Sequence, residues 1–144
     1  MTQPFSLHGR TALVTGTGSE SGIGFATARF LARQGARIVI SATSERVITR
    51  SEELNREGFD SLALIADLTD RNQAHALIAS SIEHLGRLDI LVNNAGMVQT
   101  GVTLTSGYLA DQPADDWARQ VELTLMTAVN LTRAAIPVMR AQSY

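Results

Sequence analysis

The sequence predicts an α/β fold in which a doubly wound parallel sheet carries helices on both faces. Four short apolar runs, at residues 11–15, 37–42, 62–66 and 88–93, alternate with longer stretches whose apolar residues recur at helical spacing. The runs are continuously apolar, as strands that are buried on both faces require. Strand–helix–strand units of this kind cross over in a right-handed sense and lie parallel. We expect the strand order 3-2-1-4, which leaves the apolar edge of the fourth strand open.

The composition indicates a globular protein and argues against several classes of partner. The 144 residues suit one domain, which we expect to span residues 1–144, and 44% of them are hydrophobic. The net charge of −2 argues against a nucleic-acid partner, which normally meets a basic face. No apolar run reaches the roughly 18–20 residues that span a bilayer, so no membrane segment is expected. The N-terminus does not resemble a secretory signal, and we therefore expect a cytoplasmic protein.

Some reactive centres are excluded by residue type. The chain has no cysteine, which rules out disulfides, thiolate metal sites and a cysteine nucleophile. Its three histidines share no metal-ligand spacing, so we expect no metal site.

Capping residues mark the ends of the expected helices. The first helix follows the first strand and ends at Gly35, which suits a C-terminal cap. Ser44 is the expected N-cap of the second helix, which runs towards Gly58. Asp70 is the expected N-cap of the third helix, and Gly86 closes it.

A long helix is expected over residues 114–140. Pro113 suits its start, and Pro137 should end or kink it near its last turn. Residues 124–139 are apolar nearly all round, which implies cover on more than one side. Further sheet would supply such cover, and so would a second copy of the chain. A homo-oligomer held through this helix is therefore one of two expectations.

A glycine-rich loop at residues 16–24 directly follows the first strand. Glycines allow a tight turn and let phosphate oxygens approach the backbone. The helix that begins near Gly22 directs free N–H groups and its positive dipole end at the same place, so main-chain amides would bind a diphosphate. No G-x-x-x-x-G-K-[ST] pattern is present, which excludes a P-loop. An ordinary glycine-rich turn is the alternative interpretation, and the position after the strand disfavours it.

The end of the second strand bears on which dinucleotide would bind. NAD sites of this kind place an acidic residue there, about 20 residues beyond the glycines, to accept hydrogen bonds from the adenosine ribose. Thr43 and Ser44 occupy that place, and Arg46 follows closely. The missing acid and the nearby cation favour NADP(H), while NAD(H) would bind if Glu45 turned towards the ribose. In the alternative interpretation Ser44 only caps a helix, and Glu45 and Arg46 are solvated.

Four stretches resemble the short-chain dehydrogenase/reductase family. They are residues 10–16 with Gly-Ile-Gly at 22–24, Asp-Leu at 67–68, Asn-Asn-Ala-Gly at 93–96, and a long helix with Trp117 and Leu125. The Asn-Asn-Ala-Gly stretch behind an apolar strand is highly specific for the family. Residues 41–44 most resemble bacterial 3-oxoacyl-carrier-protein reductases, which use NADPH. The resemblance implies a Rossmann-type sheet whose last strands lie beyond residue 144.

The resemblance also implies which residues would contact the dinucleotide. Those near the diphosphate are Gly16, Ser19, Ser21, Gly22, Ile23 and Gly24. Those near the adenosine are Thr43, Ser44, Asp67 and Leu68, with Asp67 accepting from the adenine amino group. Those near the nicotinamide half are Asn94, Ala95 and Gly96. All of them follow the C-terminal ends of predicted parallel strands, where the ligand crevice of such a sheet opens. As alternatives, Asp67 is a loop or capping acid and Asn94 belongs to a buried polar network.

The sequence departs from the family pattern in three places. The glycine loop is two residues longer when Gly16 is taken as its first glycine. Thr124 stands seven residues after Trp117, where the family has an asparagine that supports a proton relay. A threonine there can bond to the preceding turn, which would weaken or reroute the relay. The family's catalytic serine and Tyr-x-x-x-Lys motif are absent, the chain has no lysine, and Tyr144 is its last residue.

Two hypotheses for function follow from these features. In the first, the chain is the N-terminal part of an NADP(H)-dependent reductase or dehydrogenase. It would act on a small carbonyl or alcohol substrate, carried by an acyl carrier in one version, with catalytic groups beyond residue 144. The chain alone would then be inactive, since no lysine-activated acid can be built from it. In the second, it is a non-catalytic dinucleotide-binding or interaction module that functions at this length. The open edge of the fourth strand favours the first hypothesis.

Overall fold

The computed structural model describes residues 5–96 and 108–142, and Tyr144 lies outside them. Within this part of the chain a four-stranded sheet forms, with all neighbouring strands parallel. Its strands are β1 (Thr11–Thr15), β2 (Arg37–Ala42), β3 (Ser61–Ile65) and β4 (Ile90–Val92). The order β3-β2-β1-β4 confirms the predicted order and leaves β4 at one edge of the described sheet.

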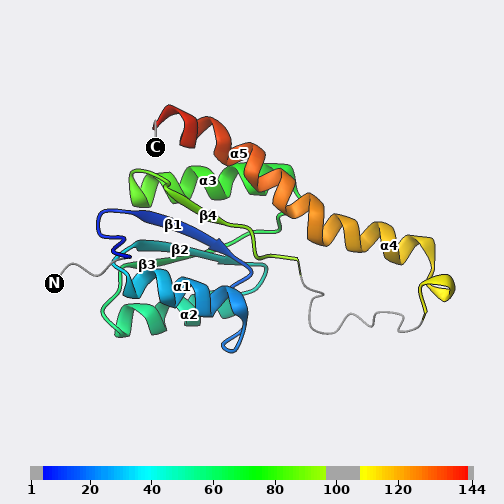
Figure 1. The fold of residues 1–144 in the computed structure, drawn as a ribbon, viewed down its shortest axis with the longest axis horizontal. Coiled ribbons are helices and arrows are strands. Elements are labelled where there is room, and N and C mark those ends of the chain that lie inside the picture. Colours follow the sequence, from blue (N-terminus) through cyan, green and yellow to red (C-terminus); the bar gives the residue numbers. More distant parts are fainter. Residues whose placement is uncertain (1–4, 97–107, 143–144) are drawn as a thin grey trace.

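Helices cover both faces of the sheet, which confirms the predicted fold class (Figure 1). On one face lie α1 (Ile23–Arg33) and α2 (Arg46–Arg56), and on the other lie α3 (Arg71–Leu85) and α5 (Thr127–Ala141). A short 3-10 turn η1 (Leu109–Asp111) precedes α4 (Ala114–Val121). A π-helical turn η2 (Glu122–Met126) joins α4 to α5, and α4 lies beyond the C-terminal ends of the strands (Figure 1).

Two apolar clusters, one on each face of the sheet, form the core. Successive residues of β1 point to opposite faces, so Val14 packs with Phe25 of α1 while Leu13 packs with Leu131 of α5. Both clusters are fully or almost fully buried. This is why the strands read as continuous apolar runs rather than as alternating ones.

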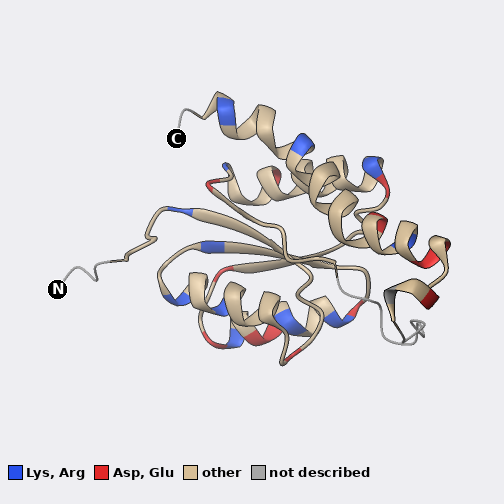
Figure 2. Cartoon of the chain, turned by 45° about the vertical axis from the view of Figure 1, so that its right-hand side comes forward, with Lys and Arg blue, Asp and Glu red and all other residues tan. Residues whose placement is uncertain are grey.

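Ion pairs link the outer surfaces of α1 and α2. The Nε of Arg29 on α1 lies 2.9 Å from a carboxylate oxygen of Glu57, at the C-terminal end of α2, and its Nη2 lies 3.7 Å from a carboxylate oxygen of Glu53 on α2. Figure 2 shows acidic and basic residues interspersed along these two helices.

Among the described residues no helix combines the length and the apolar character needed to cross a bilayer.

A buried carboxylate ties β1 to β4 at the N-terminal edge of the sheet. The side chain of Asp89 is 0% exposed, and its Oδ2 accepts a hydrogen bond from the backbone N–H of Thr11 at 3.0 Å. Arg87 donates to its Oδ1 through Nε at 2.9 Å and through a terminal nitrogen at 2.6 Å. Asp89 therefore joins β1 to its neighbour β4 at the end of the sheet opposite the loops discussed below.

The structure corrects the predicted N-cap of the second helix. Glu45 rather than Ser44 occupies the N-cap position of α2, and no side chain caps this helix. The Ser44 hydroxyl instead accepts a hydrogen bond from Nε of Arg46 at 3.3 Å. The prediction failed because the Ser44 hydroxyl bonds to the Arg46 side chain and not to a backbone N–H in the first turn of α2. The predicted caps of α3 are confirmed, since Asp70 accepts from the N–H of Asn72 and Gly86 adopts the left-handed conformation.

Two strand ends and one helix end also differ from the prediction. Strand β3 begins and ends one residue earlier than expected, and β4 covers only the middle of residues 88–93. Pro137 lies inside α5, which continues to Ala141. The last turn is held because the Gln142 side chain accepts from the N–H of Leu88 at 2.8 Å and donates to its carbonyl at 2.7 Å. These bonds tie the C-terminal end of α5 to the segment before β4.

Candidate functional site

The C-terminal ends of the strands bring the predicted site segments together. The loops after β1, β2, β3 and β4, together with the first two residues of α1, contain all of the residues that the sequence singles out for a dinucleotide. Because the strands are parallel, these loops meet at one edge of the sheet, towards α4 in Figure 1. In an open α/β sheet this edge is the place where ligands bind.

A single buried hydroxyl joins the ends of β1 and β4. Thr15 Oγ1 donates to the carbonyl of Val92 at 3.2 Å and accepts from the backbone N–H groups of Asn94 at 3.1 Å and Ala95 at 3.0 Å. Thr15 is 1% exposed, and these bonds use the one donor and both acceptor positions of the hydroxyl. Sequence reasoning missed this residue, although a polar residue at the end of an apolar strand was an available signal.

We expect Thr15→Val to destabilise the protein. Valine keeps the shape of threonine but leaves the N–H groups of Asn94 and Ala95 without their acceptor. An unpaired buried donor costs about 1–3 kcal/mol, so urea denaturation should show a loss in that range. Thr15→Ser, which retains the hydroxyl, is the matched control and should lose less. Equal stability of the two variants would contradict the assigned role of the hydroxyl.

The side chain of Asn94 holds the start of the glycine loop by two hydrogen bonds. Its Nδ2 donates to the carbonyls of Thr15 at 3.0 Å and Gly16 at 3.2 Å. A Cβ on Gly16 would lie 2.7 Å from that Nδ2, and Gly16 has the left-handed φ of +70°. A Cβ on Gly24 would lie 2.6 Å from the carbonyl oxygen of Gly16. The buried polar network expected as one role of Asn94 is thus present, and its contact with a dinucleotide stays a prediction.

The N-terminus of α1 points its free amides at the same loop. Gly22 is its N-cap, no side chain caps it, and its first turn contains no acidic residue. The first N–H groups of a helix have no partner within the helix and favour an anion. With Gly24 buried and Ile23 exposed, the donors at this end fit a phosphate group. The free N–H groups at the start of α1 therefore suit the diphosphate of a dinucleotide.

The first half of the glycine loop is anchored to β2. The backbone N–H and the hydroxyl of Thr17 both donate to the carbonyl of Ser41, each at 3.1 Å, and Thr17 is 0% exposed. Ser19, Glu20 and Ser21 are exposed, so the longer loop projects outward. Sequence reasoning did not single out Thr17, because its partner lies on another strand.

The loops after β2 and β3 form the expected adenosine side. Thr43 is exposed, and Ser44 is half-buried beside Arg46. The exposed Asp67 accepts from the N–H of Thr69 at 3.0 Å and from its hydroxyl at 2.8 Å, which is the loop role that the sequence allows, and its contact with adenine stays a prediction.

Leu68 is fixed by a residue that sequence reasoning missed. Its side chain is 5% exposed, and its carbonyl accepts from Nδ2 of Asn130 on α5 at 3.0 Å. A buried asparagine within the apolar stretch of the long helix was the signal that could have identified this contact. The helix layer thus holds the loop after β3 in place.

The π-helical turn η2 contacts the loop after β4. Thr124 Oγ1 donates to the carbonyl of Gly96 at 2.9 Å. The expectation that Thr124 bonds to the preceding turn is corrected, because its hydroxyl reaches across to the loop. The bond to the preceding turn is made by Thr127, whose hydroxyl donates to the carbonyl of Leu123 at 2.9 Å.

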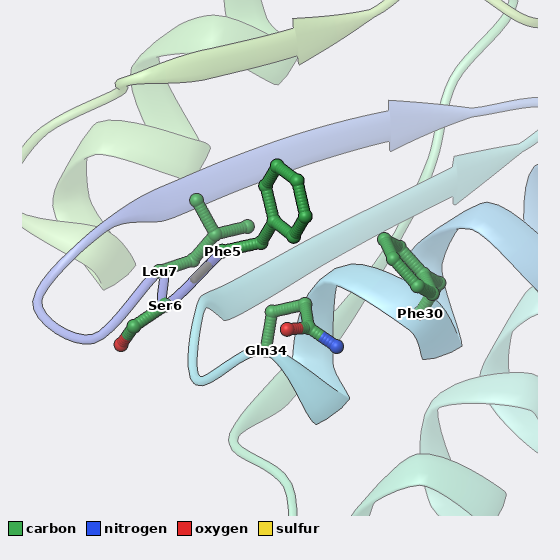
Figure 3. A pocket seen from close by; sticks show the side chains of 5 residues that line it. All are labelled: Phe5, Ser6, Leu7, Phe30 and Gln34. Carbon is green, nitrogen blue, oxygen red and sulfur yellow. The ribbon is translucent and has the colours of Figure 1, made fainter. Parts of the chain in front are cut away.

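The larger of two hollows in the described surface lies away from this edge, and the smaller one adjoins it at the C-terminal end of β3. One of about 410 Å³ is lined by Phe5, Ser6 and Leu7 before β1 and by Phe30 and Gln34 of α1 and its C-terminal end (Figure 3). A smaller one of about 120 Å³ lies between β3 and α3.

Within residues 5–96 and 108–142, no group of three or more His, Asp or Glu is arranged to hold a metal ion.

Residues 10–144 match the family model for short chain dehydrogenases. The chain belongs to the short chain dehydrogenase family. It is 36% identical over 137 residues to a Streptomyces virginiae protein named as a ketoacyl reductase of monensin polyketide synthase, covering 94% of this chain and 48% of that one. The chain thus spans about half the length of the curated relatives it matches.

Solved structures of the same family share the fold. A short chain dehydrogenase from Mycobacterium smegmatis superposes with a TM-score of 0.84 at 34% identity, over 98% of this chain and 57% of that one. A metagenomic short-chain oxidoreductase in complex with NADP superposes with a TM-score of 0.80 at 32% identity, over 94% of this chain and 59% of that one. The Rossmann-type sheet expected from the sequence is confirmed.

Proposed function

We propose that the protein is an NADP(H)-dependent oxidoreductase that transfers a hydride between nicotinamide and a carbonyl or alcohol substrate. The observation that carries this proposal is the uncapped N-terminus of α1 above Gly16 and Asn94. Main-chain N–H groups at that point suit the diphosphate, because the helix dipole and the free donors act together. When bound, the nicotinamide supplies or accepts the hydride.

The residues of this chain hold and orient the dinucleotide. The N–H groups at the start of α1 bind the diphosphate between Gly16 and Gly24, with the exposed Ser19 and Ser21 as further donors. The carboxylate of Asp67 accepts from the adenine amino group, and the backbone of Leu68 lies beside the ring. The loop after β4 lines the nicotinamide half.

The groups that handle the proton are proposed to lie beyond residue 144. The nascent alkoxide needs an acid, and the sequence contains no lysine that could activate one. A serine, a tyrosine and a lysine in the following part of the domain would supply this chemistry, as the family resemblance implies. We expect residues 1–144 without them to carry out no hydride transfer.

The substrate class is proposed from a relative, and the assembly is proposed from the exposed apolar residues of the long helix. The Streptomyces virginiae relative is named for ketoacyl reduction, which supports a carbonyl substrate carried as an acyl group. Large apolar side chains are exposed along α4, η2 and α5, namely Trp117, Val121, Leu125 and Ile136. Exposed apolar residues of this size favour pairing with a second copy of the chain through residues 114–140. A cytoplasmic location stays a prediction.

NADP(H) is proposed over NAD(H) from the end of β2. Thr43 and Ser44 carry no charge that would repel a 2′-phosphate, and the Arg46 guanidinium lies beside Ser44. We expect Thr43→Asp to raise the Kd of NADPH at least about tenfold, because like charges in contact are destabilising, and to leave that of NADH unchanged or lower. Calorimetric titration of the full-length protein measures both constants.

Thr49→Asp on the exposed surface of α2 is the matched control for this substitution. It adds the same charge without placing it at the end of β2, so both dinucleotides should bind as to the wild type. Tighter binding of NADH than of NADPH by the wild type would overturn the preference.

A further inference from the structure

We infer that Thr124 is a positioning residue, which sets the wall of the nicotinamide half through its hydrogen bond to Gly96. The inference rests on the proposed function, since it concerns the loop after β4. Thr124 lies in the π-helical turn, and its hydroxyl donates to the Gly96 carbonyl at 2.9 Å. π-helical turns inside α-helices are rare and occur frequently at functional sites.

The loop after β4 is held from two opposite sides. The N–H groups of Asn94 and Ala95 bond to Thr15 on β1, at 3.1 Å and 3.0 Å. The carbonyl of Gly96 bonds to Thr124 on the helix, and the Thr127 hydroxyl lies 3.5 Å from the carbonyl of Ala95. Donors and acceptors of successive residues are thus fixed between the sheet and the helix. This arrangement removes freedom that a ligand would otherwise have to restrict on binding.

The approach of the helix to the loop is close enough to depend on Thr124. A Cβ placed on Gly96 would lie 3.2 Å from Cα of Thr124 and 3.3 Å from its Cγ2. The loop and the turn are therefore in van der Waals contact as well as hydrogen-bonded. A change at Thr124 is transmitted directly to the backbone of Gly96.

Because Thr124 is exposed, its role in positioning the loop can be distinguished from a role in the stability of the fold. Its side chain is exposed, whereas Thr127 is only 5% exposed. Water can replace the Thr124 hydroxyl as a partner of the Gly96 carbonyl, so removing the hydroxyl leaves no buried group unpaired. Loss of this bond should loosen the position of Gly96 more than it lowers the stability of the fold.

The test compares two ligands in the full-length protein. Thr124→Val keeps the shape but removes the donor, and Thr124→Ser keeps the donor. Calorimetry is performed with NADPH and with adenosine 2′,5′-bisphosphate, which lacks the nicotinamide half. We expect Thr124→Val to raise the Kd of NADPH about fivefold, as the loss of one hydrogen bond implies, and to change that of the bisphosphate less than about twofold. Thr124→Ser and the control Thr49→Val should bind both ligands as the wild type does.

The possible results distinguish failure of the role inferred for Thr124 from failure of the proposed function. Equal weakening of both ligands, or a Thr124→Val chain that does not fold, would identify Thr124 as merely structural and overturn the inference. Unchanged NADPH binding by Thr124→Val would also overturn it. A wild-type protein that binds neither NADPH nor NADH would refute the proposed function itself, which is a distinct result.

Discussion

Gly24→Ala is expected to lower the free energy of unfolding by about 2–3 kcal/mol and to abolish dinucleotide binding, because there is no room for a methyl group between α1 and the glycine loop. The added Cβ would lie 2.6 Å from the carbonyl oxygen of Gly16 and would also meet Nδ2 of Asn94. Both atoms are fixed, since Asn94 is bonded to Thr15 and Gly16. The start of α1 must then move away from the loop, and its N–H groups no longer converge on one point. Urea denaturation and calorimetric titration with NADPH measure the two effects.

Gly18→Ala in the same loop is the matched control for stability. A Cβ on Gly18 would lie 3.4 Å from Cβ of Ala42 and 3.9 Å from Oγ of Ser44, which are ordinary contacts. We expect the free energy of unfolding to change by less than about 1 kcal/mol, as surface substitutions usually do. Equal stability of Gly24→Ala and Gly18→Ala would contradict the close packing of α1 against the loop.

Asp89→Asn is expected to lower the free energy of unfolding at neutral pH by about 2 kcal/mol, because hydrogen bonds to a buried charged group are among the stronger ones. The neutral amide retains one acceptor oxygen but loses the charge that pairs with Arg87. Asp60→Asn is the control at the same edge of the sheet. Asp60 also bonds to an arginine, at 2.6 Å from Arg37, but its side chain is 49% exposed. An exposed pair contributes less than about 1 kcal/mol, so its loss should be small.

The same carboxylate makes part of the stability depend on pH. Burial alone would raise the pKa of Asp89, but the hydrogen bonds from Arg87 and Thr11 outweigh it and hold the pKa below its ordinary value. The stabilisation is therefore complete above the unfolded-state pKa of about 4 and is lost as the pH falls through the lower folded-state pKa. Denaturation at a series of pH values should show the difference between wild type and Asp89→Asn shrinking below about pH 4. A difference that does not change with pH would contradict this account.

The sequence predicted the sheet because its evidence was local. Each strand is a continuous apolar run, and burial on both faces is a direct consequence of helices on both sides. Asp70 and Gly86 were correctly predicted because a cap depends on residues within one turn of the helix. Ser44 was wrongly predicted as the cap because its hydroxyl bonds to the Arg46 side chain, and the residue types alone do not fix which partner it takes.

The contacts that build the site were less accessible from the sequence. Thr15 and Thr17 act on residues of neighbouring strands, and Asn130 acts on a loop more than 60 positions earlier in the chain. Such pairs depend on the register and the packing of the sheet, which residue types do not specify. The glycines were easier to find, because close backbone approach leaves only one residue type at Gly16 and Gly24. The contact of Thr124 with Gly96 required the π-helical turn, which no pattern in the sequence predicted.

The most direct test is a crystal structure of the full-length protein grown with NADPH. We expect the diphosphate at the N-terminus of α1, with its oxygens within hydrogen-bond distance of the N–H groups of Ile23 and Gly24, and the nicotinamide beside Gly96. A dinucleotide bound at another edge of the sheet, or density that shows side chains filling the space at the start of α1, would contradict it.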